Sequence, residues 1–303
     1  MRLELQKVHH ALSERILGKS QQLHLAMACL LANGHLLIED LPGMGKTTLS
    51  HALSQVFGLQ YSRIQFTSDL LPSDMLGVNI FSSHDNQFSF RHGPIFSQVV
   101  LADELNRASP KTQSALLEAM EERQVSIDGV THPLPAPFFV IATQNPGYQA
   151  GTYPLPESQL DRFFMRISLG YPAWDAEEAM LRQNNVSTSL ATCVDEKALQ
   201  NMQKHVAQMQ VNSNVIRYIL KLVNASREPG AYPNPLSPRA SRALLQGAKA
   251  WAFMFDRDYV TPDDVQAVFE AITAHRLNGT SQPSVEGASL CKRLFDSVDP
   301  LAA

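Results

Sequence analysis

The sequence of 303 residues predicts an α/β fold in which a five-stranded parallel sheet is followed by an all-α domain. Five short apolar runs lie before residue 171 and alternate with segments of helical periodicity, which is typical of a parallel sheet covered by helices. A glycine-rich loop follows the first of these runs. Beyond Tyr171 and Pro172 the apolar spacing is helical throughout. We therefore expect an α/β core over residues 1–171, a helical domain over 172–276 and a C-terminal tail over 277–303.

The strands of the core are predicted from apolar runs that have the length of a buried strand. In order they read HLLIED, YSRIQF, SQVVLAD, FFVIAT and FFMRISL, and helices are expected between them, among them 20–33 and TTLSHALSQVF. Two polar segments, at 77–93 and 124–132, interrupt this alternation. The second contains Asp128-Gly129, a dipeptide typical of hairpin turns. Both segments are predicted to form β-hairpins that project from the sheet unit.

The second domain contains further helical patterns, and one of them has a cap signal. Thr261 precedes Pro262, and Asp264 follows three residues after the threonine, which resembles a capping box. Trp174 and Trp251 are expected to pack among these helices, and the tail is expected to close with one short helix. The helices are predicted near 174–184, 195–209, 212–226, 239–255 and 261–274.

Composition limits the classes of protein to consider. The formal net charge of −4 provides no basic footprint for wrapping nucleic acid. No apolar run approaches the roughly 20 residues needed to cross a bilayer, and the first residues lack the apolar stretch of a signal peptide. The cysteines Cys29, Cys193 and Cys291 lie far apart, which argues against a disulfide framework or a zinc site. A cytoplasmic protein without a membrane segment is therefore expected.

Residues 39–48, EDLPGMGKTT, resemble a phosphate-binding loop. The pattern G-x-x-x-x-G-K-[ST] fits Gly45, Lys46 and Thr47, but Asp40 stands where the pattern has its first glycine. If that position requires a positive φ, aspartate is one of the few other residues that adopts it at modest cost. Asp40→Gly should accordingly change nucleotide affinity only modestly. The expected nucleotide-binding residues are Pro42, Gly43, Met44, Gly45, Lys46, Thr47 and Thr48.

Each part of this loop has a distinct task in binding ATP. The backbone N–H groups around Gly43 and Gly45 can meet several phosphate oxygens at once, because no side chain crowds them. Lys46 can reach the outer phosphates as a point charge, and the Thr47 hydroxyl can coordinate Mg²⁺. The helix that follows directs its positive end at the ligand. ATP and Mg²⁺ are therefore the expected ligands.

Polar residues at the ends of two later strands supply groups for hydrolysis. The run VVLADELNR delivers Asp103 and Glu104 at the end of an apolar strand. Asp103 is expected to hold Mg²⁺, and Glu104 to orient or activate the attacking water as a general base. The strand FFVIAT ends at Gln144-Asn145, where an amide could place the water or bind the terminal phosphate.

These residues carry a family resemblance that extends from ILGKS to about residue 275. The runs GPIFSQVVLADELNRASPKTQSALLEAMEERQVSIDG, PFFVIATQNP, GTYPLPESQLDRFFMRISLGYP and SPRA resemble the MoxR family of AAA+ ATPases. The EDLPG opening also resembles MoxR proteins, in which a residue other than glycine is familiar at position 40. The resemblance implies an AAA+ P-loop core with a helix-2 insert at 77–93, a pre-sensor-1 hairpin at 124–132 and an all-α lid domain. It also implies that Leu17 and Gly18 pack on adenine.

The same resemblance implies roles for residues that the spacing alone does not assign. Asn145 matches sensor 1, and Arg162 in LDRF matches the arginine finger that reaches the nucleotide of a neighbouring subunit. Arg239 in SPRA matches sensor 2, with Arg242 as the nearest alternative. Guanidinium groups stabilise the negative charge that spreads over the transferred phosphoryl group. An isolated subunit is therefore expected to hydrolyse ATP poorly.

The resemblance implies a ring of subunits, expected to be a hexamer, that uses ATP to remodel or mature protein complexes or metalloenzymes. A partner with a von Willebrand A domain is also implied, and the client itself is not named by the sequence. One alternative is a nucleic-acid motor of the MCM type, but its hairpins need basic residues, and the two segments contain only Arg91. Others are a magnesium-chelatase-type ATPase subunit and a nucleotide-gated scaffold with little turnover. The scaffold leaves Glu104 without a purpose.

Overall fold

The computed structural model of the chain describes residues 2–84, 86–145, 151–182, 189–278 and 284–299. The core elements are α1 (Arg2–Arg15), α2 (Ser20–Leu31), β1 (Leu36–Glu39), α3 (Lys46–Val56), β2 (Tyr61–Gln65), α4 (Pro72–Leu76), β3 (Gly77–Ser82), β4 (Gln87–His92), η1 (Pro94–Phe96), β5 (Val99–Asp103), η2 (Leu105–Arg107), α5 (Pro110–Glu122), β6 (Gln124–Ile127), β7 (Val130–Pro133), β8 (Phe139–Gln144), α6 (Glu157–Leu160) and β9 (Met165–Ile167). The helices that follow are α7 (Trp174–Arg182), α8 (Glu196–Gln208), α9 (Ser213–Ser226), α10 (Pro238–Met254), α11 (Pro262–Leu277) and α12 (Ser284–Asp296).

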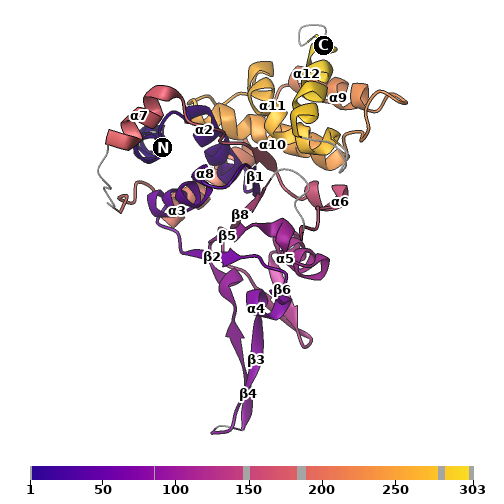
Figure 1. Cartoon of the computed structure of the whole chain (residues 1–303). Coiled ribbons are helices and arrows are strands. Elements are labelled where there is room, and N and C mark those ends of the chain that lie inside the picture. Colours follow the sequence, from indigo (N-terminus) through magenta and orange to yellow (C-terminus); the bar gives the residue numbers. More distant parts are fainter. Residues whose placement is uncertain (1, 85, 146–150, 183–188, 279–283, 300–303) are drawn as a thin grey trace.

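The centre of the molecule is a five-stranded sheet with strand order β2-β5-β8-β1-β9. All neighbouring strands in it pair in parallel. The strands are those predicted from the five apolar runs, so the predicted fold class is confirmed. Because every strand runs in the same direction, the loops after β1, β5 and β8 meet at one edge of the sheet (Figure 1).

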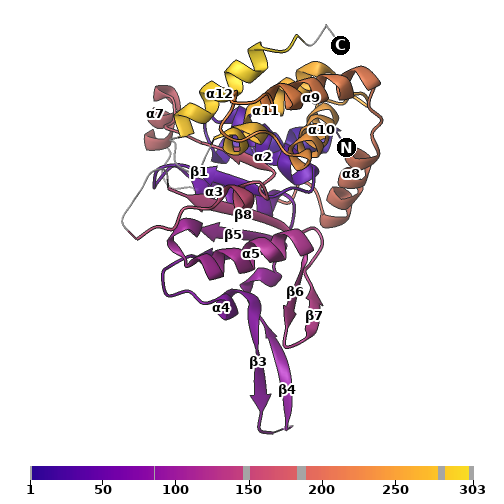
Figure 2. The same cartoon turned by 90° about the vertical axis from the view of Figure 1, so that its right-hand side faces the viewer.

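Both faces of this sheet are covered, which explains why its strands are apolar almost throughout. Along β1, Leu36 and Ile38 join a cluster that includes side chains of α1, α2 and α3, whereas Leu37 joins a cluster on the side of α5. Figure 1 shows α3 on one side of the sheet and α5 on the other, and in Figure 2 the α5 layer lies in front of the strands. Side chains alternate between faces along a strand, so two clusters form from continuous apolar runs.

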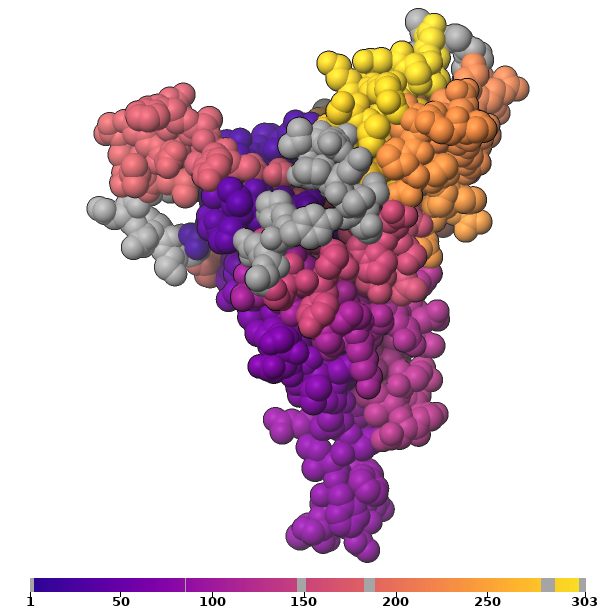
Figure 3. Space-filling model, turned by 45° about the vertical axis from the view of Figure 1, so that its right-hand side comes forward, coloured from indigo at the N-terminus to yellow at the C-terminus, as the bar shows by residue number. Residues whose placement is uncertain are grey.

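The two predicted hairpins form as separate two-stranded sheets, β3–β4 and β6–β7. The β3–β4 hairpin projects from the body of the molecule as a narrow extension (Figures 1 and 3). The hairpins contact each other, because Asn79 Nδ2 donates to Asp128 Oδ2 at 2.6 Å and the Phe90 and His132 rings stack at 4.0 Å. Side-chain contacts therefore link the two hairpins.

The helical half contains the predicted helices, and α11 begins at the predicted cap. The backbone N–H of Thr261 donates to Asp264 Oδ2 at 2.8 Å. The tail helix α12 lies on α11, with Thr273 Oγ1 and Cys291 Sγ at 3.1 Å. Trp251 packs against the core, but the packing predicted for Trp174 is wrong, since it is 82% exposed. Helix α7 stands apart from the other helices of this half, which leaves Trp174 uncovered (Figure 1).

Two observations bear on the environment of the protein. All three cysteines are free thiols. Within the described ranges, no helix has both the length and the apolar character that crossing a membrane requires.

Candidate functional site

The phosphate-binding loop connects β1 to α3 at the carboxyl edge of the sheet. Gly43 and Gly45 have φ angles of 86° and 88°, in the left-handed region that favours glycine. A Cβ at either position would meet no other atom within 4 Å, so the space above the loop is open. Lys46 begins the eleven-residue helix α3, and Thr47 and Thr48 lie exposed in its first turn. This open cradle at a helix N-terminus fits the phosphates of a nucleotide.

Lys46 is the buried cation of this site, with 8% of the residue exposed. Its Nζ donates to the backbone oxygen of Asp40 at 2.6 Å and to Asn145 Oδ1 at 3.2 Å. Burial lowers the pKa of the Lys46 ammonium, and the negative charges of Asp40, Asp103 and Glu104 oppose that shift. Three carboxylates therefore surround the cation that the sequence predicts to bind the outer phosphates.

Asp103 ends β5 and is 7% exposed. Thr143 Oγ1 donates to its Oδ1 at 2.6 Å, and Arg63 Nη2 donates to its Oδ2 at 2.6 Å. These two donors come from β8 and β2, the strands on either side of β5. The carboxylate is thus fixed from both sides. Together with the Thr47 hydroxyl it offers the hard oxygen donors that Mg²⁺ prefers, so these residues fit the predicted metal.

Glu104 directly follows Asp103 and has a φ of 57°, which is uncommon for a residue other than glycine. Its carboxylate accepts hydrogen bonds from Gln65 Nε2 at 2.8 Å, Arg107 Nη1 at 2.9 Å and Asn145 Nδ2 at 3.4 Å. Its backbone N–H donates to Thr143 Oγ1 at 2.8 Å. Three side chains thus orient a carboxylate whose backbone holds it in a strained conformation.

The structure brings together four of the predicted site residues. Lys46, Glu104 and Asn145 are joined by hydrogen bonds, and Asp103 precedes Glu104 on the same strand end. A cation, a carboxylate predicted to bind metal, a candidate general base and an amide therefore share the carboxyl edge beside the open loop. These are the groups that a phosphoryl transfer to water requires.

The predicted adenine segment lies beside this edge. Gly18 has a φ of 73°, and a Cβ there would come within 3.1 Å of Ala176 Cβ on α7. Lys19 Nζ donates to the backbone oxygen of Tyr171 at 2.7 Å. The next residue toward the N-terminus, Gly170, is bonded to Asp40 next to the loop. The chain between β9 and α7 thus connects the Leu17-Gly18 segment to the phosphate-binding loop.

The structure gives Asp40 a role that the sequence did not predict. Its backbone does not take a positive φ, so the conformational explanation offered for it is wrong. Instead, the buried carboxylate accepts from the backbone N–H groups of Leu169 at 2.5 Å and Gly170 at 2.8 Å, and from Ser168 Oγ at 3.3 Å. Asp40 therefore ties the start of the loop to the segment that leaves β9.

We expect Asp40→Gly to lower the free energy of unfolding by about 2–4 kcal/mol, because the buried N–H of Leu169 and the partly buried N–H of Gly170 lose their acceptor. Nucleotide affinity should fall by less than about tenfold, since the carboxylate faces the β9 exit and not the open cradle. Equilibrium urea unfolding and nucleotide titration measure the two quantities. Asp40→Asn, which keeps one acceptor oxygen, is the control and should lose less stability. A larger loss of affinity than tenfold would indicate direct contact with nucleotide.

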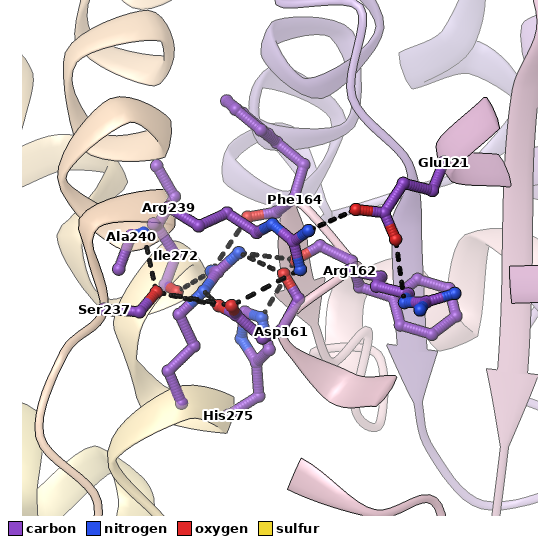
Figure 4. Close-up of polar contacts among 11 residues, drawn as sticks. Glu121, Asp161, Arg162, Phe164, Ser237, Arg239, Ala240, Ile272 and His275 are labelled. Atoms are coloured by element: carbon purple, nitrogen blue, oxygen red, sulfur yellow. Dashed lines mark hydrogen bonds and ion pairs between the residues drawn. The ribbon is translucent and has the colours of Figure 1, made fainter. Parts of the chain in front are cut away.

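Arg162 and Arg239 do not join this site; they lie together on another carboxylate (Figure 4). Arg162 Nε is 3.1 Å from Glu121 Oε2, and Arg239 Nη2 forms an ion pair with Glu121 Oε1. Arg239 Nη1 is 3.6 Å from Asp161 Oδ2. Arg242, the alternative for sensor 2, is exposed and makes none of these contacts. The geometry therefore favours Arg239 as the partner of Arg162.

This arginine cluster lies at the amino edge of the sheet. Arg162 precedes β9, whose Met165 pairs with Leu36 at the start of β1, and Phe164 N donates to the His35 carbonyl. At about 3.3 Å per residue, the four residues of β1 separate the two edges by about 13 Å. That length exceeds an arginine side chain. Neither arginine can reach the phosphate-binding loop of its own chain.

Several neighbours of the predicted residues were missed by the sequence analysis. Arg63 and Gln65, which contact the acid pair, alternate with the buried Ile64 along β2, and this alternation could have identified them as side chains of the same face. Arg107 follows its partner Glu104 by three residues, a spacing that could have identified it, whereas Glu121 gave no local signal because its partners Arg162 and Arg239 are distant in the chain.

Comparison with known proteins agrees with this arrangement. The model of the "ATPase family associated with various cellular activities (AAA)" matches residues 35–165, and that of the "AAA lid domain" matches residues 233–293. The chain is 44% identical to the uncharacterised protein YeaC of Bacillus subtilis over 275 residues, covering 90% of this chain and 86% of YeaC. It is 39% identical to Chaperone MoxR1 of Mycobacterium tuberculosis over 277 residues, covering 86% of this chain and 72% of MoxR1.

A crystal structure of a Cytophaga hutchinsonii protein assigned as an ATPase superposes with a TM-score of 0.88 at 36% identity, covering 98% of this chain and 95% of that one. The similarity thus extends over the core and the helical half together. Membership of this family implies that the chain binds nucleotide. The chain belongs to the MoxR family of AAA+ ATPases.

Proposed function

We propose that the protein hydrolyses ATP in a ring, expected to be a hexamer, in which each site is shared by two subunits. The observation that carries this proposal is the separation of the site into two edges of the sheet. Lys46, Glu104 and Asn145 lie at the carboxyl edge, whereas Arg162 and Arg239 lie at the amino edge. A head-to-tail ring brings the arginines of one subunit to the phosphate-binding loop of the next.

Within each site, Lys46 binds the outer phosphates, and Thr47 and Asp103 hold Mg²⁺, which neutralises charge on the phosphates when it is bound. Glu104 orients the attacking water and accepts its proton, with Asn145 as the adjacent amide. The backbone of Pro42, Gly43, Met44 and Gly45, with Thr48, encloses the phosphates, and Leu17 and Gly18 contact adenine.

We further propose the division into a core over 1–171, a lid over 172–276 and a tail over 277–303, in a cytoplasmic protein. Continuous packing supports a lid that moves together with parts of the core. Buried side chains of α10, α11 and α12 share one cluster with those of α1, α2 and α3. Asp40 provides a second link, through the segment that leads from β9 toward the lid. ATP turnover at the loop can in this way displace the lid.

The client is proposed to be a protein complex or metalloenzyme, recruited with a partner that carries a von Willebrand A domain, as in the family. Exposed apolar residues on the projecting hairpin support a protein client over nucleic acid. They are Val78, Ile80, Phe81 and Phe88, with exposed fractions of 40–72%. The two hairpins offer Arg91 as their sole cationic side chain of the Lys or Arg type among described residues, which gives no basis for phosphate contacts.

The test is ATP turnover per subunit as a function of protein concentration, measured with Mg²⁺ alongside the mass of the assembly by light scattering. We expect turnover per subunit to rise steeply over the concentration range in which rings form, because the arginines act between subunits. Turnover that is independent of concentration would show that one chain contains a complete site. Binding of ATP without release of phosphate at any concentration would support the scaffold instead.

A further inference from the structure

Glu121 is the shared partner of the two arginines, although the known chemistry of the site assigns it no role. It lies in the last turn of α5, where Glu121 and Glu122 occupy the negative end of the helix, and the C-cap Arg123 that follows donates instead to the backbone oxygens of Asn33 and Phe138. A carboxylate at this end is unfavourable for the helix itself. Its position therefore requires an explanation other than helix stability.

The way in which Glu121 holds Arg162 leaves the arginine available for a ligand. The ion pair involves Nε of Arg162, at 3.1 Å from Oε2. A guanidinium has five N–H donors in a planar fork, and two pairs of them belong to the terminal nitrogens. Within the described part of the chain, the ion pair is closest at Nε, and the terminal nitrogens of Arg162 donate no hydrogen bond to another residue. The fork that binds phosphate in a bidentate manner is thus free.

Arg239 is fixed by the same carboxylate and by an anchored second one. Glu121 Oε1 pairs with its Nη2, and Asp161 Oδ2 lies 3.6 Å from its Nη1. Asp161 is itself held by the buried Arg276, whose Nε lies 2.7 Å from Oδ1, and by the Ser237 hydroxyl at 3.3 Å. Figure 4 shows Glu121 between the two arginines and Asp161 on the side of the helical half. The cluster thus joins the end of α5, the segment before β9 and the start of α10.

Two guanidinium groups placed side by side repel each other, and in water each would sample many rotamers. A carboxylate that gives one oxygen to each offsets the repulsion and restricts both side chains. We propose that Glu121 is a positioning residue that orients Arg162 and Arg239 together toward the nucleotide of the neighbouring subunit. This inference rests on the proposed function, because it requires the arginines to act between subunits.

Glu121→Ala should lower kcat by about 10- to 100-fold, because a misplaced catalytic group loses rate without losing its charge. KM for ATP should change less than twofold, since the phosphate-binding loop of the same chain lies at the other edge. The free energy of unfolding should stay close to that of the unmodified protein, because exposed ion pairs contribute little stability. Glu121→Gln retains one acceptor oxygen for the two arginines, so its kcat should lie between that of Glu121→Ala and that of the unmodified protein. Glu122→Ala is the matched control and should match the unmodified protein.

Mixing separates a positioning role from a structural one. Glu121→Ala subunits retain Glu104, and Glu104→Gln subunits retain Glu121 with both arginines. In a random one-to-one mixture of rings, about one site in four combines an intact Glu104 with an intact neighbouring cluster. We expect ATP turnover to recover to about that fraction of the level of the unmodified protein, well above the mean turnover of the two separate preparations.

The inference is overturned if Glu121→Ala turns over ATP within twofold of Glu122→Ala, or if mixing gives no recovery. Either result would remain compatible with a site that is shared between subunits, provided that Arg162→Ala has lost its ATP turnover. If the unmodified protein instead hydrolyses ATP equally well as separate subunits, the proposed function fails and the inference fails with it. The concentration dependence of the unmodified protein distinguishes these two failures.

Discussion

Glu104→Gln should retain ATP and lose nearly all hydrolysis. The substitution removes the group that accepts a proton from water but keeps the size of the side chain. A positioned general base contributes roughly 10² to 10⁴ in rate, or about 3 to 5 kcal/mol of transition-state stabilisation. ATP affinity should change little, because Lys46, Thr47 and the loop glycines are untouched. Single-turnover hydrolysis and equilibrium nucleotide binding measure the two effects.

The surroundings of Glu104 make this substitution a clean test. Gln65 and Arg107 both donate to Oε2, so an amide oxygen turned to that position can still accept both hydrogen bonds, and only the longer one from Asn145 Nδ2 at 3.4 Å is lost. The left-handed backbone at residue 104 is the same for either side chain. Glu122→Gln makes the same chemical change at an exposed position of α5 and should leave turnover unchanged. Undiminished turnover in Glu104→Gln would refute its assignment as the base.

The parallel sheet could be predicted because its evidence is local. Each strand is a continuous apolar run, and the hydrophobic free energy of covering both faces of such a run leaves few alternatives. The turn at Asp128 could be predicted for a similar reason, since Asp-Gly favours the positive φ angles found there, 51° and 81°. Trp174 was misjudged because helical spacing identifies a helix but not whether another element covers it.

The residues of the candidate site differ in the same way, since some are predictable from local sequence and others depend on contacts between distant segments. The loop glycines and the acid pair follow strand ends, so sequence order alone predicts that they meet at one edge. The arginine cluster depends on contacts between residues far apart in the chain. Glu121 and Arg239 are separated by 118 positions, and no local pattern links them. Asp40 was read as a conformational exception, whereas its carboxylate serves a hydrogen-bonding role with residues about 130 positions away.

Arg162→Ala is the second substitution with a large expected effect. An arginine that reaches a neighbouring nucleotide contributes about 10³ to 10⁵ in rate, or roughly 4 to 7 kcal/mol. The loss should appear in kcat, because the arginine stabilises charge that develops during transfer of the phosphoryl group. Arg217→Ala, on the exposed face of α9, removes the same side chain elsewhere and is the control. Steady-state turnover at concentrations that support full assembly is the measurement.

The alternative for Arg162 is a local salt bridge with Glu121, which is also lost in Arg162→Ala. Mixing Arg162→Ala subunits with Glu104→Gln subunits distinguishes the two readings, since each preparation alone is nearly inactive. If the arginine acts between subunits, an Arg162→Ala subunit beside a Glu104→Gln subunit has both its own base and a neighbouring finger. At equal proportions about one site in four is complete, and turnover should return to that fraction of the unmodified level. A salt bridge acts only within its own chain, so the mixture would then remain as inactive as its components.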